Sequence, residues 1–442
     1  MRGRLARRSI SVFILSVAGT VLAFGVQVLL ARAIGAASYG VYAYVLGWLN
    51  IVVLLAKLDF DTSATRFMGA YGGRGEWSLL RGFLRRSHAV VTSASISVGL
   101  LSALAVWALR DRLDPAVASA ALVASALLPV TALLQLTLTS LQGLQRVVQA
   151  QVPAMLVRPL LFGAGILLAA YVWRLELRAA DAIALNLGSS VVALAVSAVL
   201  LRRAIPDGAR HVKPAYSDRE WVRVAFGMLL ISASQVVLSQ YADVVVVGTI
   251  VGTTEAGYYG AASQLATLVQ FGVTAVLFVA TPVIAELYAQ GRGAALQRLV
   301  WVVGRVNLAI SIPIVAVLAL GGKLLLGLYG PTFGHAYSVL VVLSLSQLVA
   351  AALGSLAGFL LTMTGHQYEA ARIIGLSAAV NLALTLLLTP ALGIVGAAFA
   401  TLVGILLRSI LLYSAIRTHL RIDPLPFLGR SSGPEPASRG SG

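Results

Sequence analysis

The stretch IGAASYGVYAY at residues 34–44 recurs in related form as VGTTEAGYYGA at residues 251–261. The ungapped alignment pairs Gly35 with Gly252, Gly40 with Gly257 and Tyr42 with Tyr259. The same offset also pairs Tyr71 with Tyr288, Leu79 with Leu296 and Arg81 with Arg298. A register kept over nearly 50 residues is hard to attribute to composition. The two halves of the chain are therefore predicted to repeat each other.

The composition predicts that both halves lie in a membrane. Of the 442 residues, 59% are hydrophobic and only 11% are charged, and the mean hydropathy is +0.90. A soluble domain carries about 25% charged residues. The chain contains no cysteine, which excludes disulfides and thiolate metal sites, and its five histidines are scattered. We therefore predict an all-α polytopic membrane protein with no metal site and no cofactor.

Apolar runs of about 20 residues, the length that crosses a bilayer, predict twelve spans. They lie near residues 10–31, 41–63, 88–109, 117–140, 152–173, 182–201, 222–250, 260–285, 300–320, 337–361, 370–389 and 393–415. The longest polar segment divides them into two groups of six. The expected domains are an N-terminal six-helix bundle (1–205), a cytoplasmic linker (206–221), a C-terminal six-helix bundle (222–416) and a disordered cytoplasmic tail (417–442).

The basic residues predict the orientation. Of 33 Lys and Arg residues, 26 fall on one side of the predicted spans, and Lys57 lies within a span. The other side receives six: Arg32, Arg110, Arg112, Arg174, Arg178 and Lys323. The positive-inside rule then places both termini in the cytoplasm. This asymmetry accounts for most of the net charge of +17, so no nucleic-acid partner is predicted.

The repeat favours a transporter over a channel or a membrane enzyme. Because six is an even number, both halves enter the membrane from the same side, and a pseudo-two-fold axis along the membrane normal relates them. Alternating-access transporters use this arrangement, in which two similar bundles enclose a central cavity and rock against each other.

Three segments carry a recognisable pattern of Gly, Tyr and small residues: ATRFMGAYGGRGEWSLLRGFLRRS (64–87), QYADVVVVGTIVGTTEAGYYGAASQL (240–265) and NLALTLLLTPALGIVGAAFATLVG (381–404). They resemble bacterial polysaccharide flippases, the Wzx-type branch of the multidrug/oligosaccharidyl-lipid/polysaccharide (MOP) exporter superfamily. The resemblance implies a V-shaped, two-bundle transporter in the bacterial inner membrane. It also implies that the protein moves undecaprenyl-pyrophosphate-linked oligosaccharide from the cytoplasmic to the periplasmic leaflet, for O-antigen, capsule or exopolysaccharide synthesis. A polysaccharide polymerase and a chain-length regulator are the implied protein partners.

Two other functions remain open at this stage. A drug or small-molecule antiporter would share the fold, and a membrane-embedded polymerase or glycosyltransferase is a weaker alternative. No Walker A, G-x-G-x-x-G or H-E-x-x-H sequence occurs, and no catalytic nucleophile, base and orienting acid can be assembled. We therefore expect a protein that is not an enzyme and that uses an ion gradient, the membrane potential or removal of product.

The stretch LLAKLDFDTSATRF (54–67) places charged residues within the second apolar run. On an ideal helix Lys57 and Asp61 are four residues apart and form an ion pair, while Asp59 and Arg66 share another face. The set is either structural or lines the pathway, because charged groups inside a membrane usually face a cavity or another charge. We predict that at least one of Asp59, Asp61 and Arg66 lines the cavity.

Polar residues in other spans supply further candidates. In span seven, Ser232, Gln235, Ser239 and Asp243 form a stripe at spacings of three and four. Gln135 lies in span four, in a polar series that includes Thr131. Hydrogen bonding between helices accounts for many such residues, but Asp243 is a candidate proton or cation site. With Lys57, Asp59 and Asp61, it completes the predicted set of intramembrane charges.

Arginines near the predicted cytoplasmic ends are candidates for binding the pyrophosphate of a lipid-linked substrate. Guanidinium groups bind phosphate oxygens with bidentate geometry. Arg66, Arg158 and Arg305 stand out because they lie at or within the span boundaries. Arg32, at the far end of span one, is the periplasmic candidate. Together with Gln135 and Gln235, these four arginines are the predicted substrate-binding residues.

Overall fold

A computed structural model describes residues 2–290, 292–354, 357–358, 360–361 and 366–420. Within these ranges the chain is almost entirely helical and contains no strand. Most of the predicted tail (417–442) lies outside the described residues. Its first residues, Arg417–Leu420, continue the last helix, so the predicted tail begins too early. Helical form continues to Leu420, and within it Thr418 Oγ1 donates a hydrogen bond to the carbonyl of Ser414, one turn earlier.

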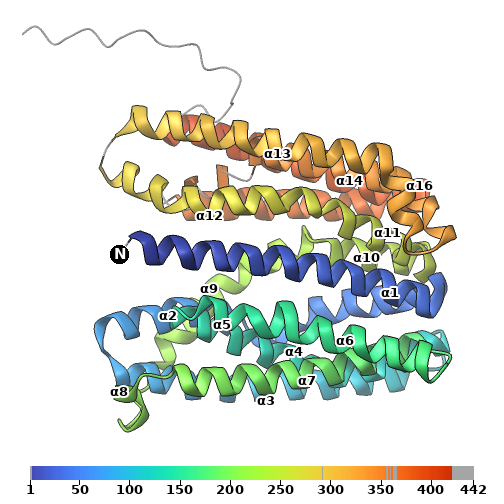
Figure 1. Cartoon of the computed structure of the whole chain (residues 1–442), viewed down its shortest axis with the longest axis horizontal. Coiled ribbons are helices and arrows are strands. Elements are labelled where there is room, and N and C mark those ends of the chain that lie inside the picture. Colours follow the sequence, from blue (N-terminus) through green and yellow to red (C-terminus); the bar gives the residue numbers. More distant parts are fainter. Residues whose placement is uncertain (1, 291, 355–356, 359, 362–365, 421–442) are drawn as a thin grey trace, which may run out of the picture.

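Two helices are long enough to cross a membrane twice. Nine helices of the described part are long and apolar enough to span a bilayer. Two of these, Ile14–Lys57 (44 residues) and Tyr368–His419 (52 residues), have about twice the length that one crossing needs. Gly35 (φ 76°) and Gly393 (φ 59°) lie inside them with non-helical angles that glycine adopts at low cost. The chain reverses direction at the end of the blue helix in Figure 1. When helices that share one predicted span, such as Asp218–Val237 and Gln240–Ile250, are counted together, the described helices correspond to the twelve predicted spans.

The helices form two bundles, which are the lower and upper halves of Figure 1. The first contains α1 (Arg2–Lys57), α2 (Phe60–Arg74), α3 (Trp77–Leu109), α4 (Pro115–Gly143), α5 (Val147–Val152), η1 (Pro153–Val157), α6 (Arg158–Ile166), η2 (Leu167–Val172) and α7 (Ala179–Ala204). The second contains α10 (Gln240–Ile250), α11 (Thr253–Ala266), α12 (Leu268–Ala289), α13 (Gly293–Gly327), η3 (Pro331–Ala336), α14 (Tyr337–Val349), η4 (Ala350–Gly354) and α16 (Gln367–Leu420). We call them the N bundle and the C bundle.

The connection between the bundles is attached to the N bundle. It contains the short helix α8 (Asp207–Arg210) and leads into α9 (Asp218–Val237), which starts inside the predicted linker. Trp221 is fully buried; its ring packs edge-on against Phe83, and its indole N–H donates to the Tyr71 hydroxyl over 2.9 Å. The first turns of α9 therefore belong to the N bundle, while α10, on the same predicted span, belongs to the C bundle.

Two predicted spans are interrupted where no glycine marks a break. Leu58 (φ 49°) and Asp59 (φ 57°) adopt left-handed angles between α1 and α2. Between α9 and α10, Ser239 is extended and caps α10 by accepting the Tyr241 N–H. The predicted stripe through span seven is therefore wrong as a continuous face, because the break separates Ser232 and Gln235 from Asp243.

Repeat-related residues meet where the bundles touch. Gly40 and Gly257, which the sequence repeat pairs, lie in direct contact: a Cβ atom on Gly257 would be 2.7 Å from the Cα of Gly40. Two equivalent points that touch must lie beside the axis that relates them. Glycine is required on both sides, since a side chain would separate the helices. The contact between α1 and α11 therefore lies next to the pseudo-two-fold axis.

Candidate functional site

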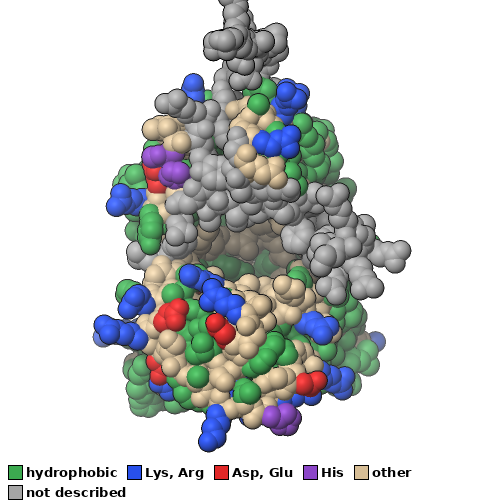
Figure 2. Space-filling view, turned by 90° about the vertical axis from the view of Figure 1, so that its left-hand side faces the viewer, with side chains coloured by type: hydrophobic (Ala, Val, Ile, Leu, Met, Phe, Trp, Pro, Cys, Tyr) green, Lys and Arg blue, Asp and Glu red, His purple; other side chains and the backbone are tan. Residues whose placement is uncertain are grey.

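A cavity of about 550 Å³ lies between the two bundles. Its walls come from α1, α4, η1, α6 and α7 on one side and from α10 and α11 on the other. Figure 2 views the end that carries the N-terminus and α8, and shows the molecule hollowed between its two halves. We call this the basic end, because Lys and Arg side chains gather on it. The hollow is open in this conformation at the basic end.

The opposite end is closed by contacts between the bundles. Tyr39 of α1 packs against Tyr329 and Phe333 of the C bundle, with ring centroids 6.0 and 5.6 Å apart. Close by, the Gly40–Gly257 contact brings the helices together, and the hydroxyls of Tyr44 and Thr249 are 3.2 Å apart. Tyr39 also lines the cavity. This layer of aromatic and small residues therefore forms the end wall of the cavity.

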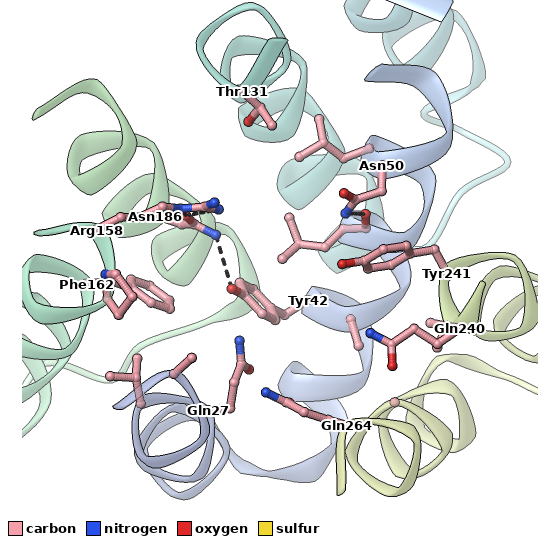
Figure 3. Close-up of a pocket in the computed structure, with 18 of the residues that line it drawn as sticks. Gln27, Tyr42, Asn50, Thr131, Arg158, Phe162, Asn186, Gln240, Tyr241 and Gln264 are labelled. Atoms are coloured by element: carbon pink, nitrogen blue, oxygen red, sulfur yellow. Dashed lines mark hydrogen bonds between the residues drawn. The ribbon is translucent and has the colours of Figure 1, made fainter. Parts of the chain in front are cut away.

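Arg158 is the charged residue of the described cavity wall. Its Nε and Nη2 donate to Oδ1 of Asn186 over 3.2 and 2.9 Å, and the Asn186 amide donates to the Tyr42 hydroxyl over 3.2 Å (Figure 3). The Tyr42 ring is stacked on Phe162. These contacts use two of the five guanidinium N–H groups. The remaining donors are available for an anion, in a geometry that the Asn186–Tyr42 pair holds in place.

Arg158 lies deeper in its span than the predicted position near the cytoplasmic end. It lies 11 residues after the start of the 26-residue span Val147–Val172, near the middle of the membrane. The positive-inside rule applies to loops and span ends, so it does not explain this arginine. A guanidinium at this depth is costly unless it has partners or faces a polar cavity, and Arg158 has both.

The C-bundle side of the cavity carries neutral polar groups. Gln240 and Tyr241 lie at the start of α10, and Gln264 lies on α11 (Figure 3). The Oε1 atom of Gln240 is buried and accepts no hydrogen bond from the described residues. From the N bundle, Gln27 and Asn50 add two more side-chain amides. The described lining thus combines one cation with a set of groups that both donate and accept hydrogen bonds.

A second polar site lies inside the C bundle. Asp243 of α10 is only 3% exposed. Its Oδ2 accepts from the hydroxyls of Tyr259 (2.9 Å) and Thr401 (2.8 Å), and the Asn381 side chain adds a third hydrogen bond. All three partners are neutral. Tyr259 is the repeat partner of Tyr42, so equivalent tyrosines contact an acidic network in one bundle and the Arg158 network in the other.

Three charged residues of the stretch 54–67, Lys57, Asp59 and Asp61, pack beside the cavity. Lys57 Nζ is 2.6 Å from Asp61 Oδ2, which is the predicted ion pair, and it also donates to Gln135 Oε1 over 3.1 Å. Asp59 is fully buried; its Oδ1 accepts from Thr62 (3.0 Å) and from Ser232 of α9 (2.9 Å). Asp59, Asp61 and Arg66 are absent from the described lining of this cavity. Gln135 does line it.

The Lys57–Asp61 pair predicts a specific pattern of stabilities. Lys57→Met and Asp61→Asn should each lower stability, because each strands a buried polar group or charge; breaking one side of a buried pair costs about 3–5 kcal/mol. The double variant Lys57→Met/Asp61→Asn should recover most of the loss. Thermal unfolding in detergent measures this. If the double variant loses as much stability as the two single variants added together, the two residues act independently.

The remaining predicted substrate residues are absent from the described cavity wall. Arg66 is exposed on α2, with its guanidinium 5.9 Å from the ring centre of Phe67. Arg305 is exposed on α13, and Gln235 is exposed on α9. Arg32 lies at the closed end, where its Nε donates to the carbonyl of Leu328 over 2.6 Å. Among the predicted substrate residues, the cavity brings together Arg158 and Gln135.

Sequence reasoning did not select most of the amides that line the cavity. The predicted substrate residues do not include five amides of the lining: Gln27, Asn50, Asn186, Gln240 and Gln264. A usable signal was present, because each is a side-chain amide within or beside an apolar run. Among the described residues, no group of three or more His, Cys, Asp or Glu side chains is arranged to hold a metal ion.

Solved transporter structures share this fold. The chain has a TM-score of 0.75 and 15% identity to the inward-facing conformation of a multidrug resistance MATE family transporter of the MOP superfamily, over 91% of this chain and 94% of the other. An outward-facing conformation of a transporter with the same description gives a TM-score of 0.61 at 16% identity, over 94% of this chain and 95% of the other. A MOP superfamily transporter from Pyrococcus furiosus Vc1 gives 0.64 at 15% identity, with the same coverage. These likenesses establish the fold.

Sequence comparison establishes the family. No curated protein sequence matches the chain. The family model described as "Polysaccharide biosynthesis protein" matches residues 5–288, which is more than half of the chain. The match includes all but the first residues of the N bundle and the repeat that starts the C bundle. The chain therefore belongs to the polysaccharide biosynthesis protein family and has the fold of the MOP-superfamily transporters.

Proposed function

We propose that the protein is a flippase that carries undecaprenyl-pyrophosphate-linked oligosaccharide across the bacterial inner membrane by alternating access. The observation that carries the proposal is the cavity between the bundles, in which Arg158 faces a wall of amides and hydroxyls. A guanidinium binds pyrophosphate oxygens through charge-assisted hydrogen bonds. Amides and hydroxyls match sugar hydroxyls, which also donate and accept. Family membership in polysaccharide biosynthesis supports this substrate class.

In this proposal the pyrophosphate and sugars enter the cavity from the basic end while the polyprenyl tail stays in the lipid. The distribution of Lys and Arg supports a cytoplasmic basic end and cytoplasmic termini. A reporter fused after Arg417 that reads the periplasm would reverse this orientation. Separation of the layer at Tyr39, Gly40 and Gly257 would then expose the cavity to the periplasm. The polymerase and chain-length regulator act on the product there.

Reconstituted vesicles test the function. A polyprenyl-pyrophosphate oligosaccharide with a fluorophore on its terminal sugar should move between leaflets in vesicles that contain the protein, as measured with a membrane-impermeant quencher. Protein-free vesicles and the same glycan on a lipid without phosphate are the controls. Transport of a cationic dye without movement of the lipid-linked glycan would instead identify a drug antiporter.

Asp243 is the proposed coupling site, since a buried carboxylate with neutral oxygen and amide partners can take up a proton or a monovalent cation. An imposed Na⁺ or proton gradient should stimulate flipping by the wild type. Asp243→Asn should remove the stimulation, whereas Asp111→Asn, at a side chain 89% exposed between α3 and α4, should keep it. Equal stimulation of both variants would move the coupling site elsewhere.

A further inference from the structure

The two walls of the cavity differ in charge. The described lining contains 22 residues, of which Arg158 on the N-bundle wall is the charged one. The opposite wall presents Gln240, Tyr241 and Gln264 (Figure 3). A side-chain amide offers two N–H donors and one acceptor oxygen, and a tyrosine hydroxyl offers one of each. This wall can therefore satisfy groups that donate and accept, and it supplies no counter-charge.

The hydrogen bonds within the wall leave much of this capacity free. Gln240 lines the cavity, but its Oε1 is buried without a partner among the described residues and does not face the open space. Gln264 Oε1 receives only a long hydrogen bond, 3.5 Å, from the Tyr329 hydroxyl. By contrast, Asn186 on the other wall is occupied by Arg158 and Tyr42. Gln240, Tyr241 and Gln264 thus lie across the cavity from the cation, and Gln264 keeps most of its hydrogen-bonding capacity.

We infer that the C-bundle wall (Gln240, Tyr241 and Gln264) is a sugar-binding surface that selects uncharged sugars, so that the protein transports glycans of neutral sugars in preference to glycans that contain uronic acids. The inference rests on the flippase function proposed above and names its substrate class. A hydroxyl of a neutral sugar can both donate a hydrogen bond to a side-chain amide and accept one from it. A carboxylate only accepts, and its burial is costly unless a cation pairs with it.

Arg158 does not remove this penalty. In the proposed complex its free N–H groups bind the pyrophosphate, which already carries more than one negative charge. A uronate on the far wall would add another negative charge to a cavity whose described lining offers no second cation. The arginines of the basic end lie outside this lining. Selectivity therefore arises because the described lining leaves a uronate carboxylate unpaired, so that the acidic glycan is excluded.

The test compares two polyprenyl-pyrophosphate trisaccharides that differ only in a glucose or a glucuronic acid, each with the same terminal fluorophore. In vesicles with the wild-type protein, the initial rate should be about tenfold or more higher for the neutral glycan. Gln264→Arg should raise the rate for the acidic glycan, because it places a cation on the C-bundle wall. Gln264→Met has a side chain of similar length without a charge, so it should not raise the flipping rate of either glycan.

The outcomes separate the inference from the function. Equal wild-type rates, or a faster acidic glycan, would overturn neutral-sugar selection and leave the flippase function standing. If Gln264→Arg still transports the neutral glycan, which shows that it is folded, but transports the acidic glycan no faster than the wild type, the assignment of this wall is overturned. If the wild-type protein moves neither glycan, although its cooperative thermal unfolding shows that it is folded, the flippase function itself is overturned.

Discussion

Arg158→Gln should lower the rate of flipping by about 30-fold or more, while the protein still inserts and folds. Truncating one partner of a buried, hydrogen-bonded charge pair costs about 2–5 kcal/mol, and each 1.4 kcal/mol is a factor of ten. Glutamine keeps a hydrogen-bonding group near Asn186 but removes the positive charge and the planar fork. The measurement is the initial rate of leaflet exchange of the lipid-linked glycan.

Three variants control this result. Arg158→Lys keeps the charge without the bidentate geometry, so its rate should lie between those of the wild type and Arg158→Gln. Arg66→Gln and Arg112→Gln remove exposed charges away from the cavity wall and should change the rate less than threefold, since exposed charges contribute about 1 kcal/mol or less. A wild-type rate in Arg158→Gln would show that the cavity does not bind the pyrophosphate through this residue.

The overall architecture follows from the sequence because its signals are long. Twelve apolar runs and a repeat register extending from residue 34 to residue 81 leave little choice of fold. The helix breaks have no comparable signal. Leu58 and Asp59 adopt positive φ without glycine, and a hydropathy pattern does not record a backbone angle held by tertiary contacts such as the Asp59–Ser232 hydrogen bond. The assumption of an ideal helix then placed Asp59 with Arg66.

The proposed substrate residues are harder to predict because similar residue types serve two purposes. Arg66 and Arg158 both look like positive-inside residues near a span end, and depth distinguishes them only once the start of the helix at Val147 is known. The amides Gln240 and Gln264 look like helix-to-helix hydrogen-bonding groups. Their role depends on whether they face another helix or the cavity, which is a property of the packed bundles.

A disulfide between the bundles should stop transport almost completely. Ala43 of α1 and Gly260 of α11 face each other beside the closed end, and a Cβ atom on Gly260 would be 3.6 Å from that of Ala43. Disulfides require Cβ atoms about 3.5–4.5 Å apart. The chain has no cysteine of its own, so Ala43→Cys/Gly260→Cys offers a single pair to oxidise. Alternating access requires this end to open, and a covalent bond prevents it.

A second pair distinguishes blocked opening from general damage. Val26 of α1 and Gly163 of α6 lie within the N bundle, and their Cβ atoms would be 4.0 Å apart. Oxidised and reduced Val26→Cys/Gly163→Cys should transport at the same rate if the N bundle moves as a rigid body. Oxidised Ala43→Cys/Gly260→Cys should fall to the protein-free rate and recover with reductant. If that pair, fully cross-linked by mass spectrometry, transports as fast as its reduced form, the bundles do not separate at Gly40 and Gly257, and the cavity must open to the far side elsewhere.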